Sequence, residues 1–210
     1  MNKIKKFKIS LRRKSIAGRI LRSKLDLKAA GIADEFELDK FIVSLYATLN
    51  PGVVYKLFEE RSLELENIGI KHDEMFSACV VTLGREIEDK VKEFDGNADL
   101  QTAANIILFE FLKGAVQFTA DLIKEQAEKE EFETTGIEVL YSPVFSYTTE
   151  PKFLQEAYRI EREMADKATP VIFEALNTAK INVSCDNGQI EPKATLAFLV
   201  PWQKRKRKKK

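Results

Sequence analysis

The chain has 210 residues, of which 44% are hydrophobic and 32% are charged, and its formal net charge is +1. This length suits one sizeable domain, and an apolar fraction that includes 14 Phe can form a buried core, so disorder throughout is excluded. No run of the sequence reaches the roughly 18 apolar residues that a membrane-spanning helix needs, so we expect no membrane span.

The near-neutral net charge hides an uneven distribution along the chain. Residues 1–28 are strongly basic and contain a single acid, residues 204–210 are all Lys or Arg, and the stretch between them is acidic. We therefore predict one α+β domain over 1–203, with a basic N-terminal strand and helix that packs on the acidic body, and a disordered basic tail over 204–210. Such a tail can hold an anionic partner without sequence specificity.

The first elements in chain order are predicted to be a strand over 6–11 and a basic helix over 12–27. The helix has apolar residues at helical spacing, namely Ile16, Ile20, Leu21 and Leu25. The elements that follow are a helix over 33–49, paired strands over 53–60 and 61–70, a buried strand over 76–84 and a short helix over 85–94.

The longest predicted element is a helix over 99–131, with Asp99 as its N-cap. Its apolar stripe consists of Leu100, Ala104, Ile107, Phe111, Ala115, Phe118 and Leu122. The first half is apolar on almost every side, so we expect this helix to be central to the fold, with its charged second half facing water. Gly114 in mid-helix indicates close packing against another helix.

The C-terminal part is predicted to begin with a strand over 136–141 that stops at Ser142-Pro143. A helix over 151–179, kinked or divided by Pro170, comes next. Strands over 181–186 and 194–202 are predicted to pair through an Asn187-Gly188 turn. Together the elements predict an α+β fold with a single mixed sheet covered by helices and one long central helix.

Motifs of catalytic or metal chemistry are scarce. The chain has no GxGxxG, P-loop, HExxH or GxSxG pattern, and its single histidine, His72, lies between charged residues. Cys79 and Cys185 are predicted to be reduced, buried thiols in a cytoplasmic protein. One His and two distant Cys are too few ligands for zinc, so we predict no metal and no catalytic residue.

Five stretches follow one another in an informative order. They are PGVVYKLFEE, SACVVTLGREIEDKVKEF, the helix over 99–131, EVLYSPVFSY and ALNTAKINVSCDNGQIEPKATLAFLV. This succession, over roughly 50–200, resembles the activation (reactivation) domain of cobalamin-dependent methionine synthase and its small stand-alone relatives. The best counterparts of the family's patterns are Gly52 to Phe58, Val81 to Gly84 and Pro192 to Thr195.

The resemblance implies an accessory protein of cobalamin-dependent methyl transfer. It would dock on a corrinoid-binding protein or methyltransferase, which itself holds the cobalamin, and would bind S-adenosylmethionine. If the protein is active, the implied activity is S-adenosylmethionine-dependent reactivation. The ligand-binding residues that the resemblance implies are Tyr141, Ser142, Pro143 and Phe145 in the turn and Gln117 on the long helix.

The sequence departs from the family at the ligand turn. The family's Arg, Gly and Tyr positions hold Leu140, Val144 and Phe145 here. Losing charged hydrogen bonds, each worth about 1.5–3 kcal/mol, should weaken ligand binding.

Two functions therefore remain open at this point. One is the accessory role, with or without S-adenosylmethionine. The other is a non-catalytic structural or interaction protein whose basic termini hold an acidic partner or nucleic acid.

Overall fold

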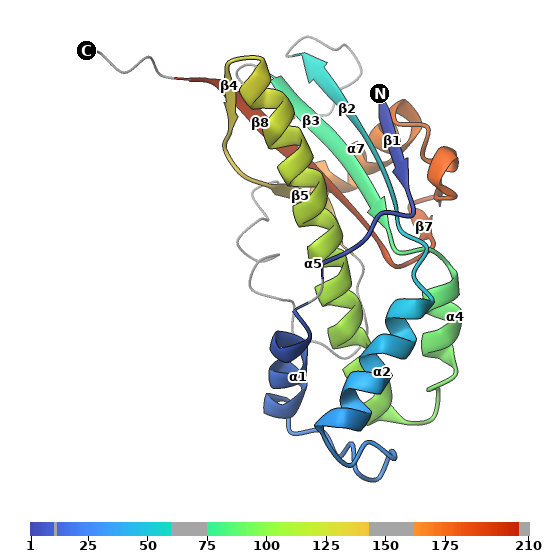
Figure 1. Ribbon diagram of the computed structural model, residues 1–210. Helices are drawn as coiled ribbons and strands as arrows, with labels where there is room; N and C mark the ends of the chain where they lie inside the picture. Colours follow the sequence, from blue (N-terminus) through green and yellow to red (C-terminus); the bar gives the residue numbers. More distant parts are fainter. Residues whose placement is uncertain (11, 60–74, 143–161, 206–210) are drawn as a thin grey trace, which may run out of the picture.

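The strands and helices are taken from a computed structural model, which describes residues 1–10, 12–59, 75–142 and 162–205 (Figure 1). In chain order they are β1 (Asn2–Lys5), α1 (Arg13–Arg22), α2 (Glu35–Ala47), β2 (Gly52–Glu59), β3 (Met75–Thr82), α4 (Glu86–Lys92), α5 (Ala98–Lys129), β4 (Phe132–Thr134), β5 (Glu138–Tyr141), α7 (Arg162–Ala175), the 3-10 helix η1 (Thr178–Ile181), β6 (Ser184–Asp186), β7 (Gln189–Glu191) and β8 (Thr195–Lys204).

Six strands of the described ranges form one sheet, and every pair in it is antiparallel. The order is β1-β2-β3-β8-β4, and β5 also pairs with β8, so β8 lies inside the sheet. The side chains of β3 and β8 are buried along nearly their whole length, as the apolar sequences of these strands predict. The predicted α+β class, with helices covering a sheet, is confirmed, but the sheet is antiparallel throughout its described strands and is not mixed as predicted.

The sheet separates two apolar cores (Figure 1). On one face, Cys79 and Val81 of β3 belong to the core beneath α5, here called the α5-side core. Their neighbours Ala78 and Val80 belong to the core beneath α7 and η1, here called the α7-side core. This alternation follows from the two-residue period of a strand, which places successive side chains on opposite faces.

The long helix α5 occupies the central position that its sequence predicts. Ile107 and Phe111 are fully buried, and the buried residues concentrate in the first two thirds of the helix. The predicted N-cap was wrong. Asn97, not Asp99, caps α5, because its side chain accepts a hydrogen bond from the N–H of Leu100 at 3.0 Å.

Gly114 is closely packed, as predicted, but its neighbour is not a helix. A Cβ atom at this position would lie 2.5 Å from Cγ2 of Ile9, in the extended segment that follows β1. Ile9 is buried there, so the glycine allows the N-terminal segment to cross α5 in contact with its backbone.

The N-terminal strand lies earlier in the chain than predicted. β1 ends at Lys5, because Lys6 has a left-handed backbone (φ +57°) and donates its N–H to the Pro51 carbonyl at 2.8 Å. α1 packs Ile16 and Ile20 into the α5-side core, and Arg19 forms an ion pair with Glu110 of α5. The basic helix therefore does pack on the acidic body, although Leu21 of the predicted apolar stripe is 65% exposed.

The strand pairing predicted near the C-terminus was wrong. The Asn187-Gly188 turn is present, but it joins β6 to β7 in a separate two-stranded sheet, whereas β8 pairs with β3, β4 and β5. Short β4, missed by the sequence reasoning, begins just after Glu131 (φ +66°) ends the α5 region. α7 continues through Pro170 as one helix. The strand predicted over 61–70 lies outside the described residues.

Among the described residues, no helix combines the length and the apolar character needed to cross a membrane. Both cysteines are free thiols; Cys79 is buried and Cys185 is half-buried.

Candidate functional site

The candidate site lies at the end of β5, where the strand contains a β-bulge. Val139 pairs with Phe198, but Tyr141 pairs with the adjacent Ala197, so Leu140 is the extra residue. Val139 belongs to the α5-side core, whereas Leu140 and Tyr141 both pack on the α7-side core. A bulge redirects side chains in this way, and here it places two consecutive residues on one face of the sheet.

Ser142, directly after β5, has a buried hydroxyl. Its Oγ atom is inaccessible to solvent and has no hydrogen-bond partner among the residues that the structure describes. Leaving a buried hydroxyl unpaired costs about 1–3 kcal/mol. Because buried polar groups are nearly always paired in folded proteins, an unpaired one needs a specific explanation.

Tyr141 contributes a second hydroxyl to this region. Burial raises the pKa of the Tyr141 hydroxyl, and the negative charge of Glu88 and the Cys185 thiol raise it further. A tyrosine with a raised pKa stays protonated at neutral pH and can donate a hydrogen bond.

Glu88 of α4 connects this region to the start of β8. Its Oε1 atom accepts the N–H of Ala194 at 2.5 Å. Burial raises the pKa of Glu88, although the Ala194 hydrogen bond and the positive charge of Lys92 oppose that shift. Burial also raises the pKa of the Cys185 thiol, so this cysteine is predominantly neutral near pH 7 and a poor nucleophile.

These groups suit binding better than bond-making chemistry. Tyr141 and Ser142 carry hydroxyls and directly follow Leu140, which is only 5% exposed. No group of three or more His, Cys, Asp or Glu in the described part of the chain could hold a metal ion. The hydroxyls of Tyr141 and Ser142 can donate or accept hydrogen bonds, which is chemistry of ligand binding.

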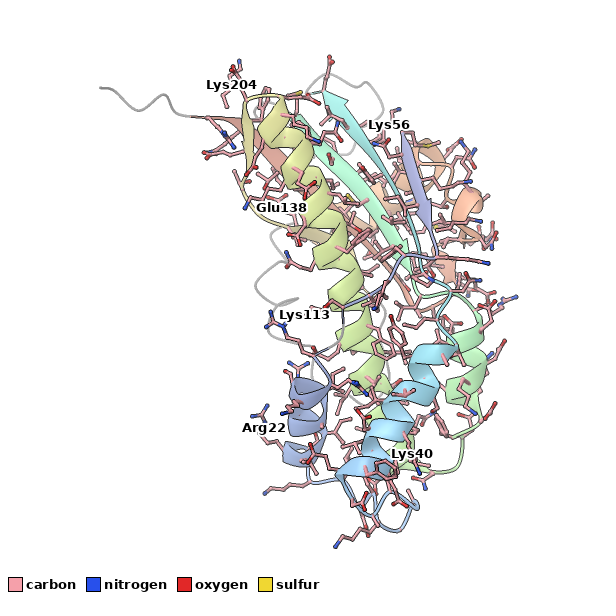
Figure 2. The ribbon with its side chains drawn as sticks, in the orientation of Figure 1. Arg22, Lys40, Lys56, Lys113, Glu138 and Lys204 are labelled. Carbon is pink, nitrogen blue, oxygen red and sulfur yellow. The ribbon has the colours of Figure 1, made fainter. Side chains whose placement is uncertain are left out.

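The structure does not bring all the predicted site residues together. Gln117 is exposed on α5, donates to Asp121 at 2.8 Å, and lies one turn after Lys113, whose side chain points away from the sheet (Figure 2). α5 covers the face opposite to the one on which Tyr141 packs. Pro143 and Phe145 lie outside the described residues.

Sequence reasoning missed a separate cleft of about 670 Å³ at the edge where β1 and β3 end and β2 begins. Its lining residues are Lys5, Lys6, Asn50–Gly52, Gly84–Glu86, Ala179, Ile181–Ser184, Glu191 and Pro192, and they do not include Tyr141, Ser142 or Gln117. They come from distant segments, so no local motif marked them.

A solved structure, but no sequence family, is similar to this chain. No protein-family model and no curated protein matches the chain. The crystal structure of the MetH reactivation domain bound to AdoHcy is similar, with 16% sequence identity and a TM-score of 0.42. The match covers 91% of this chain and 66% of that chain, so this chain spans just under two thirds of the length of that protein.

Proposed function

We propose that this protein is a cytoplasmic accessory protein of cobalamin-dependent methyl transfer. It docks on a corrinoid-bearing partner, which holds the cobalamin, and it binds S-adenosylmethionine at the end of β5. Tyr141 and Ser142 contact this ligand, together with Pro143 and Phe145, which follow them in the sequence. Gln117 lies on α5, which covers the opposite face of the sheet, and takes no part in this site.

The order of the sequence patterns supports this proposal. GVVYKLF lies in β2, VVTLG covers the end of β3 and its turn, and EVLY is β5. The long helix lies between β3 and β5, as the resemblance to the methionine synthase activation domain implies.

The single observation that carries the ligand site is the buried hydroxyl of Ser142, which has no hydrogen-bond partner within the described part of the chain. It lies where the resemblance places the ligand turn, and a bound ligand would supply the missing hydrogen-bond partner. Leu140, at the family's Arg position, is a core residue here. The ligand is therefore held by hydroxyls and apolar contact, and with lower affinity than an arginine would confer.

Calorimetric titration with S-adenosylmethionine, and with AdoHcy as a second ligand, tests the site. Ser142→Ala should lower the affinity about 2- to 10-fold, the equivalent of one neutral hydrogen bond, while leaving the ligand-free protein equally or more stable. Ser44→Ala is the matched control, since Ser44 is exposed on α2 and donates to the Phe41 carbonyl of its own helix at 2.8 Å. Absence of binding, or equal affinity in Ser142→Ala, would overturn the ligand site.

Docking is tested separately by co-elution of the full chain with a corrinoid-bearing protein on size exclusion. A complex supports the accessory role even if S-adenosylmethionine fails to bind. No complex, together with salt-sensitive retention on heparin that disappears when 204–210 are deleted, would instead favour an interaction protein that holds an acidic partner or nucleic acid.

A further inference from the structure

The cleft at the strand ends has the size of a small-molecule site. Its volume of about 670 Å³ lies within the roughly 300–1,000 Å³ that is typical of ligand pockets. Its walls come from the end of β1, the start of β2, the turn after β3, η1 and the end of β7. The cleft therefore lies where one end of the sheet meets η1 and the β6–β7 hairpin.

Two glycines, Gly52 and Gly84, allow the walls of this cleft to approach each other closely. A Cβ atom on Gly52 would lie 3.1 Å from Cβ of Ile181. Gly84 has a left-handed backbone (φ +91°), and a Cβ atom there would lie 2.9 Å from Cβ of Asn50. Larger residues at either position would push the walls apart, so the shape of the cleft depends on both glycines.

Three cations line this cleft, namely Lys5, Lys6 and Arg85. Both lysines are exposed, and no ion-pair partner for them occurs within the described ranges. Arg85 forms an exposed ion pair with Glu191 across the cleft. An exposed pair of this kind contributes only about 0–1 kcal/mol, so an incoming anion can displace Glu191 at little cost.

A second cleft of about 590 Å³ adjoins the first and adds one more cation, Lys8. The two clefts share Lys6, Asn50, Pro51 and Glu86. Together they are lined by four cations and by two carboxylates, those of Glu86 and Glu191. One of these carboxylates is paired with Arg85, and Glu86 accepts the side-chain N–H of Asn50 at 3.3 Å. The clefts therefore carry more positive than negative charge, and this excess attracts an anion.

Apolar residues form the rest of the lining, with Pro51, Ile181, Val183 and Pro192 in the first cleft. A bare anion would leave these surfaces exposed to water. The combination of cations with an apolar wall suits a molecule that has an anionic group attached to a larger, weakly polar body.

We propose that this cleft is a binding site for a small molecule that carries a phosphate or carboxylate group on such a body. Lys5, Lys6 and Arg85 bind the anionic group by charge-assisted hydrogen bonds, and the apolar residues contact the body. Glu191 is an internal competitor that occupies Arg85 until the anion replaces it. This site is independent of the one proposed at the end of β5.

The experiment is calorimetric titration of the full chain with inorganic phosphate, malonate, adenosine 5′-monophosphate and adenosine. Adenosine 5′-monophosphate should bind more tightly than phosphate, and adenosine should not bind measurably. The phosphate and malonate arms distinguish a phosphate-bearing from a carboxylate-bearing ligand. Failure of all three anions to bind at millimolar concentration would overturn the proposal.

Variants assign the binding to the cleft. Glu191→Gln should raise the affinity for the anion several-fold, and Arg85→Gln should lower it at least 5-fold. Arg13→Gln is the matched control, because Arg13 forms a comparably exposed pair with Asp39 at 2.8 Å on the distant helices α1 and α2. Equal affinities in Arg85→Gln and the unaltered protein would contradict the assignment.

Two further variants keep the result interpretable. If Arg85→Gln fails to fold by circular dichroism, the double variant Lys5→Gln with Lys6→Gln tests the same cation cluster and should also lower the affinity at least 5-fold. Ser142→Ala should leave the affinity for the anion unchanged, because the cleft and the β5 site are separate. A loss of anion affinity in Ser142→Ala as large as that in Arg85→Gln would contradict two independent sites.

Discussion

Two helical glycines, Gly18 and Gly114, have opposite surroundings. Gly18 in α1 has no atom within 4 Å of an added Cβ, whereas at Gly114 the methyl group of Ile9 would be 2.5 Å away. Alanine at an open helical position gains about 1 kcal/mol over glycine. At Gly114 the overlap with a buried, β-branched side chain should exceed that gain, since overpacking costs about 1–3 kcal/mol.

We therefore expect Gly18→Ala to raise the free energy of unfolding by about 0.5–1 kcal/mol and Gly114→Ala to lower it. Chemical denaturation measures both. In an Ile9→Ala background the penalty of Gly114→Ala should disappear. A stabilising Gly114→Ala in the unaltered background would show that Ile9 does not cross α5 at this point.

Ser77 and Trp202 form a buried polar pair inside the sheet. The indole N–H of Trp202 donates to Oγ of Ser77 at 3.1 Å, and both residues are almost completely buried. Ser77→Ala leaves the indole N–H without this acceptor and should cost about 1–3 kcal/mol. Unfolding can be followed by the fluorescence of Trp202, the single tryptophan. A loss no larger than that in the exposed Ser44→Ala would contradict this.

The residue pattern predicted how closely a residue is packed better than it predicted which residue packs against it. The sequence predicts close packing at Gly114, but the neighbour, Ile9, lies in a segment whose conformation depends on Lys6 and Pro51. Leu140 similarly occupies a core position that only the bulge in β5 explains, and a bulge has no signal in the residue pattern.

At the scale of elements, α5 supports the fold from one face of the sheet. Phe111 is fully buried and contacts Tyr46 edge to face, with ring centroids 5.8 Å apart, whereas Phe36 on α2 is 67% exposed. Phe111→Ala should lower the free energy of unfolding by about 3–5 kcal/mol, and Phe36→Ala by less than about 1 kcal/mol. Thermal and denaturant unfolding compare the two variants. Similar losses in both would show that α5 is peripheral.

α4 is joined to the start of β8 by a group that titrates. Because burial raises the pKa of Glu88 above its ordinary value of 4.5, the folded state binds a proton more tightly than the unfolded state. The stability that this carboxyl contributes is therefore fully present below pH 4.5 and is lost as the pH rises through the folded-state pKa.

Glu88→Gln keeps an oxygen acceptor for the Ala194 N–H but cannot ionise. The melting temperature of Glu88→Gln should rise relative to that of the unaltered protein as the pH increases from 4.5 to 7. Glu88→Ala, which removes the acceptor, should be less stable than Glu88→Gln at every pH. If the melting temperature of Glu88→Gln instead fell relative to that of the unaltered protein as the pH rises, the pKa of Glu88 would be lowered in the folded state and not raised.

Most helices and strands were predictable, because amphipathic and continuously apolar runs have strong local periodicity. The pairing of strands was not. β8 is apolar on both faces, so its sequence indicates burial but not which strands flank it, and the Asn187-Gly188 turn favoured the wrong neighbour. The cleft could not be predicted, since Lys5 and Lys6 lie far from Arg85 in the chain and no local pattern links them.

At the scale of the whole molecule, one sheet serves two cores. Leu199 of β8 belongs to the α7-side core and its neighbour Val200 to the α5-side core, so neither core can lose β8 without exposing the other. We expect a single cooperative unfolding transition, as for one domain. Trp202 fluorescence and far-ultraviolet circular dichroism should give coincident denaturation curves. Two separated transitions would indicate two independently folding units.

The interior position of β8 also has a consequence during synthesis on the ribosome. β3 emerges as an apolar strand whose partner on one side is still untranslated. At about 5–20 residues per second, the 112 residues that separate Thr82 from Ala194 take on the order of 10 s to translate. For that interval one edge of β3 lacks its strand partner. An unpaired apolar edge of this kind favours chaperone binding and can pair with other chains, which leads to aggregation.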